Sequence, residues 1–221
     1  MYQEARVIVE VVSAIICFIL VRYMIKPYSL TQEGRYLGLP LGFTFLGASY
    51  VISALAYTEL YHFSDFLWIQ LLARTFAFVF LAVTYYFSKK PSKNTRQLWD
   101  ITLSLLIVSL VALFLVTGIF PQVASDTYSA SQVYVRVFIV ICLSYIAIHT
   151  LRSHIKNPDP TTIWVPMGYI LLAISQYSLL FWYLDNSLAA FTGSLALRLM
   201  ALAVFLAVTY LSFKENKRTG K

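Results

Sequence analysis

Residues 101–120 read ITLSLLIVSLVALFLVTGIF and contain no charged side chain. A helix of about 20 residues rises roughly 30 Å, which is the thickness of the hydrocarbon core of a bilayer. Only helices and closed barrels satisfy their backbone polar groups in lipid, and this run is continuously apolar rather than alternating, which favours a helix. The stretch therefore predicts a membrane-spanning helix.

Similar apolar runs lie on both sides of this one. Together they predict seven spans, at residues 6–25, 38–58, 66–88, 99–120, 131–151, 163–184 and 190–213. The composition agrees, because only 12% of the residues are charged, whereas soluble domains have about 25%. The first run lacks the basic start and the small-residue cleavage site of a signal peptide, so we expect it to be retained. The sequence thus predicts an all-α polytopic membrane protein.

The basic residues gather at alternate ends of the predicted spans. They are Arg22, Lys26, Arg35, Lys89, Lys90, Lys93, Arg96, Arg152, Lys156, Lys214, Lys217, Arg218 and Lys221. The opposite ends carry the acidic residues Glu59, Asp65, Asp126 and Asp185, with Arg6 near the amino terminus. The positive-inside rule then places the amino terminus outside the cell membrane and the carboxy terminus in the cytoplasm. We interpret the net charge of +7 as a topology signal, and we expect no nucleic-acid partner.

The hexapeptide FLAVTY occurs at 80–85 and again at 205–210. At the same offset Ile16 and Cys17 fall on Ile141 and Cys142. With one residue of slippage, further identical or similar pairs align: Pro40 with Pro166, Gly42 with Gly168, Ser49 with Ser175, Tyr57 with Tyr183, and Glu59 with Asp185. Because the pairs follow in order through three helices, they predict a duplicated three-helix unit.

A linking helix between two such units gives both units the same orientation. We therefore expect two parallel repeats related by an axis along the membrane normal. The predicted divisions are a first repeat at 1–92, a linking fourth helix at 93–126, a second repeat at 127–214 and a basic cytoplasmic tail at 215–221.

This 3+1+3 arrangement resembles the SWEET sugar transporters and their PQ-loop relatives. These families carry prolines in the first two helices of each repeat, and this chain has Pro40 and Pro166 near the cytoplasmic start of the second helix of each half. The chain lacks a proline in the first helix of each half, and its Pro121-Gln122 pair is expected in an outer loop. The resemblance implies a small-solute transporter or facilitator with a pathway between the repeats.

Stretches such as LGLPLGFTFLGASYVISALAY (38–58) are similar in character to the seven-helix sensor portions of prokaryotic signalling proteins. This second resemblance implies a ligand-sensing or accessory subunit that acts through a partner protein. Retinal is excluded at the last span, because residues 190–213 contain no lysine for a Schiff base.

Four charged residues lie within the spans and away from their ends: Glu10, Arg74, Arg136 and Arg198. An arginine at a helix centre costs about 2.5–3.5 kcal/mol on insertion scales, so such groups usually face protein or water. A group of guanidinium side chains in the outer half of the membrane would favour a small polar or anionic solute. Alternatively, these arginines snorkel to the headgroups or pair with carboxylates between helices.

When the two FLAVTY copies are aligned, Arg74 and Arg198 are displaced from each other by one residue. Arg74 precedes Thr84 by ten positions and Arg198 precedes Thr209 by eleven. One residue turns a helical position by about 100°, so this alignment makes the two arginines face differently. Tyr50 and Gln176 occupy matching places after the paired serines and are further candidates for ligand binding, or for ordinary helix packing.

Signals for catalysis and for metals are missing from the sequence. The histidines have no metal-ligand spacing, and Glu10 is the only carboxylate well inside a span, since Asp100 stands at the start of 99–120, so no acid–base pair lies at depth. We therefore expect no enzyme, no metal and no cofactor. The sequence predicts a membrane transporter or, alternatively, a sensing subunit, whose partners are the bilayer, a small solute and a membrane or signalling protein.

Overall fold

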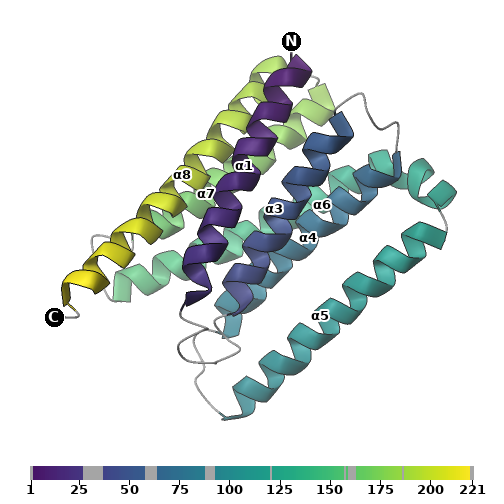
Figure 1. The fold of residues 1–221 in the computed structure, drawn as a ribbon. Coiled ribbons are helices and arrows are strands. Elements are labelled where there is room, and N and C mark those ends of the chain that lie inside the picture. Colours follow the sequence, from purple (N-terminus) through teal and green to yellow (C-terminus); the bar gives the residue numbers. More distant parts are fainter. Residues whose placement is uncertain are drawn as a thin grey trace. The chain divides into compact units, whose positions relative to one another are not determined.

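The computed structural model describes residues 2–26, 37–57, 64–87, 93–119, 121–156, 158, 163–185 and 187–219. These residues form seven α-helices, shown in Figure 1. They are α1 (Tyr2–Met24), α3 (Gly38–Tyr57), α4 (Ser64–Phe87), α5 (Lys93–Ile119), α6 (Pro121–Lys156), α7 (Trp164–Asp185) and α8 (Leu188–Thr219). The all-α architecture expected from the apolar runs is confirmed.

Six of the helices are long and apolar enough to cross a membrane. In α5, an apolar stretch is described over Gln97–Ala112. The fold is thus compatible with an integral membrane protein that has six candidate spans. The expected seventh span, at 99–120, coincides with α5 in position, and the count of seven stays a prediction.

The chain divides into two compact units. The first comprises Met1–Val135 and the second Arg136–Lys221, so the boundary falls inside the long helix α6. In the first unit α3 lies beside both α1 and α4, and α5 packs along α4 (Figure 1). In the second unit α7 packs along α8.

The core of the first unit is built largely from aromatic side chains. Phe76 and Phe80 of α4 pack with Leu110 of α5, and the ring of Phe80 stacks on that of Phe45 from α3, with centroids 5.3 Å apart. Trp99 of α5 is buried and meets Phe87 edge-on. The large aromatic surfaces on three helices thereby fix how α3, α4 and α5 lie against one another.

Glycines bring the helices of each unit close together. A Cβ added at Gly42 of α3 would lie 2.7 Å from the side chain of Leu81 on α4. In the second unit, a Cβ at Gly168 of α7 would lie 2.7 Å from the ring of Phe205 on α8. Small residues that allow close approach are typical of helix interfaces in membranes, where apolar burial contributes little.

Hydroxyl side chains bond mainly within their own helices. Thr84 donates to the carbonyl of Phe80, and Thr209 donates to that of Phe205. This satisfies the hydroxyl without a partner helix. The two FLAVTY copies are therefore packing segments whose polar residue needs no ligand.

Pro40 and Pro166 lie in the first turn of α3 and α7, as predicted. Proline costs little there because the backbone N–H groups of the first turn have no partner within the helix. The expectation for Pro121 was wrong: the Pro121-Gln122 pair begins α6 instead of lying in a loop, which agrees with the preference of proline for the first helical position. Helix α8 also continues to Thr219, into the segment expected to be a tail.

Candidate functional site

Three helices of the first unit contribute to a buried polar cluster, which consists of Glu10, Tyr50 and Arg74. The Nη2 atom of Arg74 on α4 lies 3.9 Å from Oε2 of Glu10 on α1. The same guanidinium lies 5.2 Å from the ring centroid of Tyr50 on α3. All three residues are buried. The structure thus brings together three of the predicted site residues and gives Arg74 both an ionic and a cation–π contact.

Arg6 adds a second cation–π contact one turn before Glu10. Its guanidinium lies 3.7 Å from the ring centroid of Tyr57 on α3. In the sequence, Tyr57 stood out only as a member of an aligned pair, with Tyr183, and Arg6 only as a charge near the amino terminus. The contact shows that Tyr57 also helps to hold α1 against α3.

The second unit holds its own polar cluster, beginning with Arg136 on α6 and Gln176 on α7. The Nη1 atom of Arg136 donates to Oε1 of Gln176 over 3.4 Å, and both side chains are buried. The guanidinium of Arg136 also lies 4.7 Å from the ring centroid of Tyr183 on α7. Two of the predicted site residues are therefore in direct contact across two helices.

Arg198 lies on α8 and is 1% exposed, which makes it one of the largest fully buried side chains of the chain. One helical turn earlier, the backbone carbonyl of Ser194 accepts a hydrogen bond of 2.8 Å from the hydroxyl of Ser175 on α7. Helical side chains lean toward the amino end of their helix. Arg198 and Ser194 thus lie on the same face of α8, four residues apart, and the carbonyl of Ser194 marks the turn at which Ser175 meets this helix.

Ser194 is a residue that sequence reasoning missed. Its side chain is 1% exposed, and within the described part of the chain its Oγ has no hydrogen-bond partner; the same holds for Nε2 of Gln176. A spacing rule could have found it, because a buried polar residue precedes each buried arginine by four positions: Gln70 before Arg74, Gln132 before Arg136, and Ser194 before Arg198. Residues four apart share a helix face.

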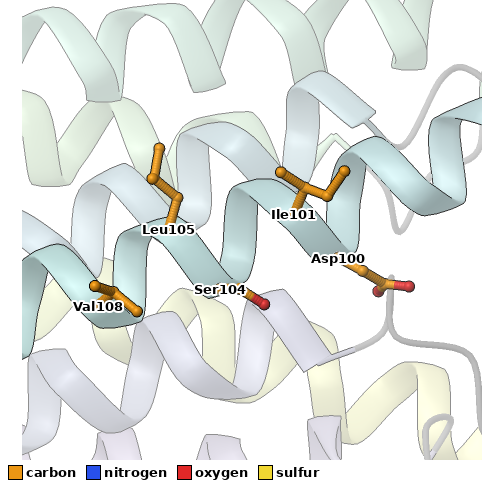
Figure 2. Close-up of a pocket in the computed structure, with 5 residues that line it drawn as sticks. All are labelled: Asp100, Ile101, Ser104, Leu105 and Val108. Atoms are coloured by element: carbon orange, nitrogen blue, oxygen red, sulfur yellow. The ribbon is translucent and has the colours of Figure 1, made fainter.

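A shallow pocket on α5 involves none of these residues. Figure 2 shows that its lining, Asp100, Ile101, Ser104, Leu105 and Val108, comes from one face of this helix. Ile101, Leu105 and Val108 are among the exposed large apolar side chains. A single helix cannot surround a ligand, and an exposed apolar face suits lipid, so the buried clusters are the better candidate site.

The chemistry of the clusters is that of recognition through charge and hydrogen bonds. Guanidinium groups donate in a planar fork, amides both donate and accept, and hydroxyls do both. Across the described residues, no three His, Cys, Asp or Glu side chains gather as a metal site would require. The arrangement can bind and orient an anionic or polar group.

Comparison of the chain with protein families, with curated proteins and with solved structures finds no match in any of the three.

Proposed function

We propose that this protein is a membrane transporter or facilitator for a small solute that carries a negative charge. The observation that carries the proposal is the burial of three arginines, Arg74, Arg136 and Arg198, inside helices long and apolar enough to cross a bilayer. Charged residues in such segments are costly and commonly mark substrate pathways.

The side chains around the arginines favour an anion over a cation. Gln176 and the serines of α7 and α8 add neutral groups that donate hydrogen bonds, and arginine suits carboxylate and phosphate oxygens. In the sequence, Glu10 is the only carboxylate well inside a predicted span. The balance of charge within the spans is therefore positive.

The proposed duplication adds a mechanical argument. Parallel three-helix repeats are a known basis for alternating access, in which one half moves as a body against the other. We propose that residues 1–92 and 127–214 are such repeats, with 93–126 as the link, an amino terminus outside and a cytoplasmic carboxy terminus. The two compact units, Met1–Val135 and Arg136–Lys221, support a division of the chain near the proposed start of the second repeat. The protein has no catalytic role in this proposal.

The test is flux into proteoliposomes that contain the purified protein. Labelled lactate, inorganic phosphate and glucose represent a carboxylate, a second anion and a neutral solute. We expect saturable uptake of an anion that protein-free vesicles do not show. Uptake of glucose alone would contradict the preference for anions, and absence of uptake for all three would contradict transport of these classes.

The alternative function, a sensing or accessory subunit, uses the same clusters. It predicts that an anion stabilises the purified protein against heat while no solute crosses the vesicle membrane. A signalling partner that co-purifies with the protein would then support this alternative.

A further inference from the structure

The buried positions within each unit align at sequence offsets that differ from the offset between the two FLAVTY copies. All seven buried residues of α7 lie 126 positions after a buried residue of α3. The pairs are Pro40 and Pro166, Gly42 and Gly168, Phe43 and Tyr169, Leu46 and Leu172, Ser49 and Ser175, Tyr50 and Gln176, and Ser53 and Leu179. The same offset takes buried positions of α1 to buried positions of α6: Glu10 to Arg136, Ser13 to Ile139, Cys17 to Leu143, and Leu20 to Ile146.

The buried residues of α4 and α8 follow an offset of 124 positions instead. The close approach of Gly42 to Leu81 has its counterpart in that of Gly168 to Phe205. This offset relates six buried residues of α4 to six of α8: Gln70 to Ser194, Leu71 to Leu195, Arg74 to Arg198, Ala77 to Ala201, Phe78 to Leu202, and Leu81 to Phe205. Arg74 and Arg198 thus hold equivalent places, whereas the FLAVTY copies are one residue out of register.

In this register the two polar clusters can be compared place by place. Arg74 corresponds to Arg198, and the place of Glu10 on the first helix is taken by Arg136. The first cluster contains the carboxylate that its arginine meets at 3.9 Å. In the second cluster both of these places carry a guanidinium.

Around the second cluster, the helices of the second unit carry arginines and no carboxylate. Aspartate and glutamate are absent from 136–156, 164–184 and 188–214; Asp185 ends α7, and Glu215 lies near the end of α8. Within the described residues, Nε2 of Gln176 and Oγ of Ser194 are buried donors that have no acceptor. A buried donor left without an acceptor destabilises the folded protein. A ligand that carries acceptor oxygens would remove this cost.

From this comparison we propose that Arg136, Gln176, Ser194 and Arg198 form a binding site for the carboxylate group of a small organic acid. The carboxylate of the ligand occupies the place that corresponds to the Glu10 carboxylate in the first unit. The first cluster is then the internally paired counterpart, and it holds helices together. This proposal rests on the proposed function and assigns its ligand class and its binding unit.

Arg136→Glu is the sharpest test, because it gives the second cluster the charge arrangement of the first. Binding is measured on the full-length protein in nanodiscs at constant ionic strength, as thermal stabilisation by lactate. Lactamide, inorganic phosphate and chloride serve as comparison probes. We expect lactate to stabilise the wild type and lactamide not to do so. Arg136→Glu should fold and weaken apparent lactate affinity by about tenfold to a hundredfold, the loss of one charge-assisted hydrogen bond.

Arg152→Glu is the matched control, because it makes the same charge change at an exposed position of the same helix. Lactate binding should survive in it. Ser194→Ala provides a second variant, in which no buried charge is changed. It should keep or raise the melting temperature of the ligand-free protein, since a donor without an acceptor is removed, and it should reduce the stabilisation by lactate.

The outcomes separate this site from the general function. If lactate does not stabilise the wild type, or stabilises Arg136→Glu equally, the carboxylate site is overturned, whereas anion uptake into proteoliposomes would still support the proposed function. Stabilisation by phosphate alone would likewise overturn the carboxylate assignment. A Ser194→Ala protein that melts earlier and binds lactate unchanged would show that Ser194 has a structural role only, and would overturn its place in the site.

Discussion

Glu10 and Arg74 are opposite charges buried on two different helices of the first unit, 3.9 Å apart at the nearest atoms. Each alone would be costly at membrane depth. Together with the ring of Tyr50 under the guanidinium, they form a mutually dependent contact among α1, α3 and α4. A buried pair of this kind contributes little relative to an apolar pair, but loss of one member leaves an uncompensated charge.

Single neutralisation should therefore be worse than double neutralisation. We expect Glu10→Gln or Arg74→Gln to lower the free energy of unfolding by roughly 3–5 kcal/mol, and the double variant to lose less than the sum. Thermal or denaturant unfolding in detergent, arranged as a double-mutant cycle, measures the coupling. Glu4→Gln, at an exposed position of the same helix, is the control. Additive effects would show that the two charges do not interact.

At the scale of elements, α7 and α8 approach each other most closely where a glycine of one helix meets a side chain of the other. Gly168 is buried against Phe205, whose ring also packs on Tyr169 with centroids 4.7 Å apart. The ring therefore cannot move aside freely. Gly193, on α8, has no atom within 4 Å of the position that a Cβ would take. The same substitution at these two glycines should have opposite effects.

Gly168→Ala should destabilise the protein by about 1–3 kcal/mol, the typical cost of overpacking a close contact. Gly193→Ala should leave stability unchanged or raise it by up to about 1 kcal/mol through its better helix propensity. Melting followed by circular dichroism in one detergent compares the two. Phe205→Leu in the Gly168→Ala background should recover part of the loss. Equal melting temperatures for both alanine variants would contradict the close packing of α7 on α8.

At the scale of the whole molecule, the distribution of charge along the chain predicts the orientation in the membrane. The connecting residues Arg35, Glu59, Lys89 and Lys90 lie outside the part of the chain that the structure describes. Two exposed and described positions near the ends of helices, Asp185 on α7 and Lys214 on α8, are predicted to lie on opposite sides. They make the orientation accessible to experiment.

Asp185→Cys should react with a membrane-impermeant maleimide in intact cells, and Lys214→Cys should react only after permeabilisation, because the positive-inside rule retains basic segments in the cytoplasm. The native cysteines, buried Cys17 and half-buried Cys142, provide the background, measured in the unsubstituted protein. The reverse labelling pattern would place Asp185 in the cytoplasm and would contradict the predicted orientation.

The sequence by itself determined the class of fold, because runs of about 20 apolar residues leave the backbone no alternative to helices in lipid. It also singled out Glu10, Arg74, Arg136 and Arg198, since charges are rare in such runs and each is conspicuous. Boundaries were less predictable: the apolar signal alone did not place residues 121–130 in α6, because helix formation there does not require an apolar composition.

Only the tertiary structure decided which of these residues meet. The buried residues of α4 and α8, Arg74 and Arg198 among them, match at an offset of 124 positions, whereas the longest identical segment of the sequence, FLAVTY, repeats at an offset of 125. The reason is physical. Identity between apolar segments can be kept by similar packing demands, whereas the faces of two helices are fixed by the contacts that close them together, and a shift of one residue turns a side chain by about 100°. The hydrogen bond from the Ser175 hydroxyl to the Ser194 carbonyl likewise showed that Ser194 lies beside α7.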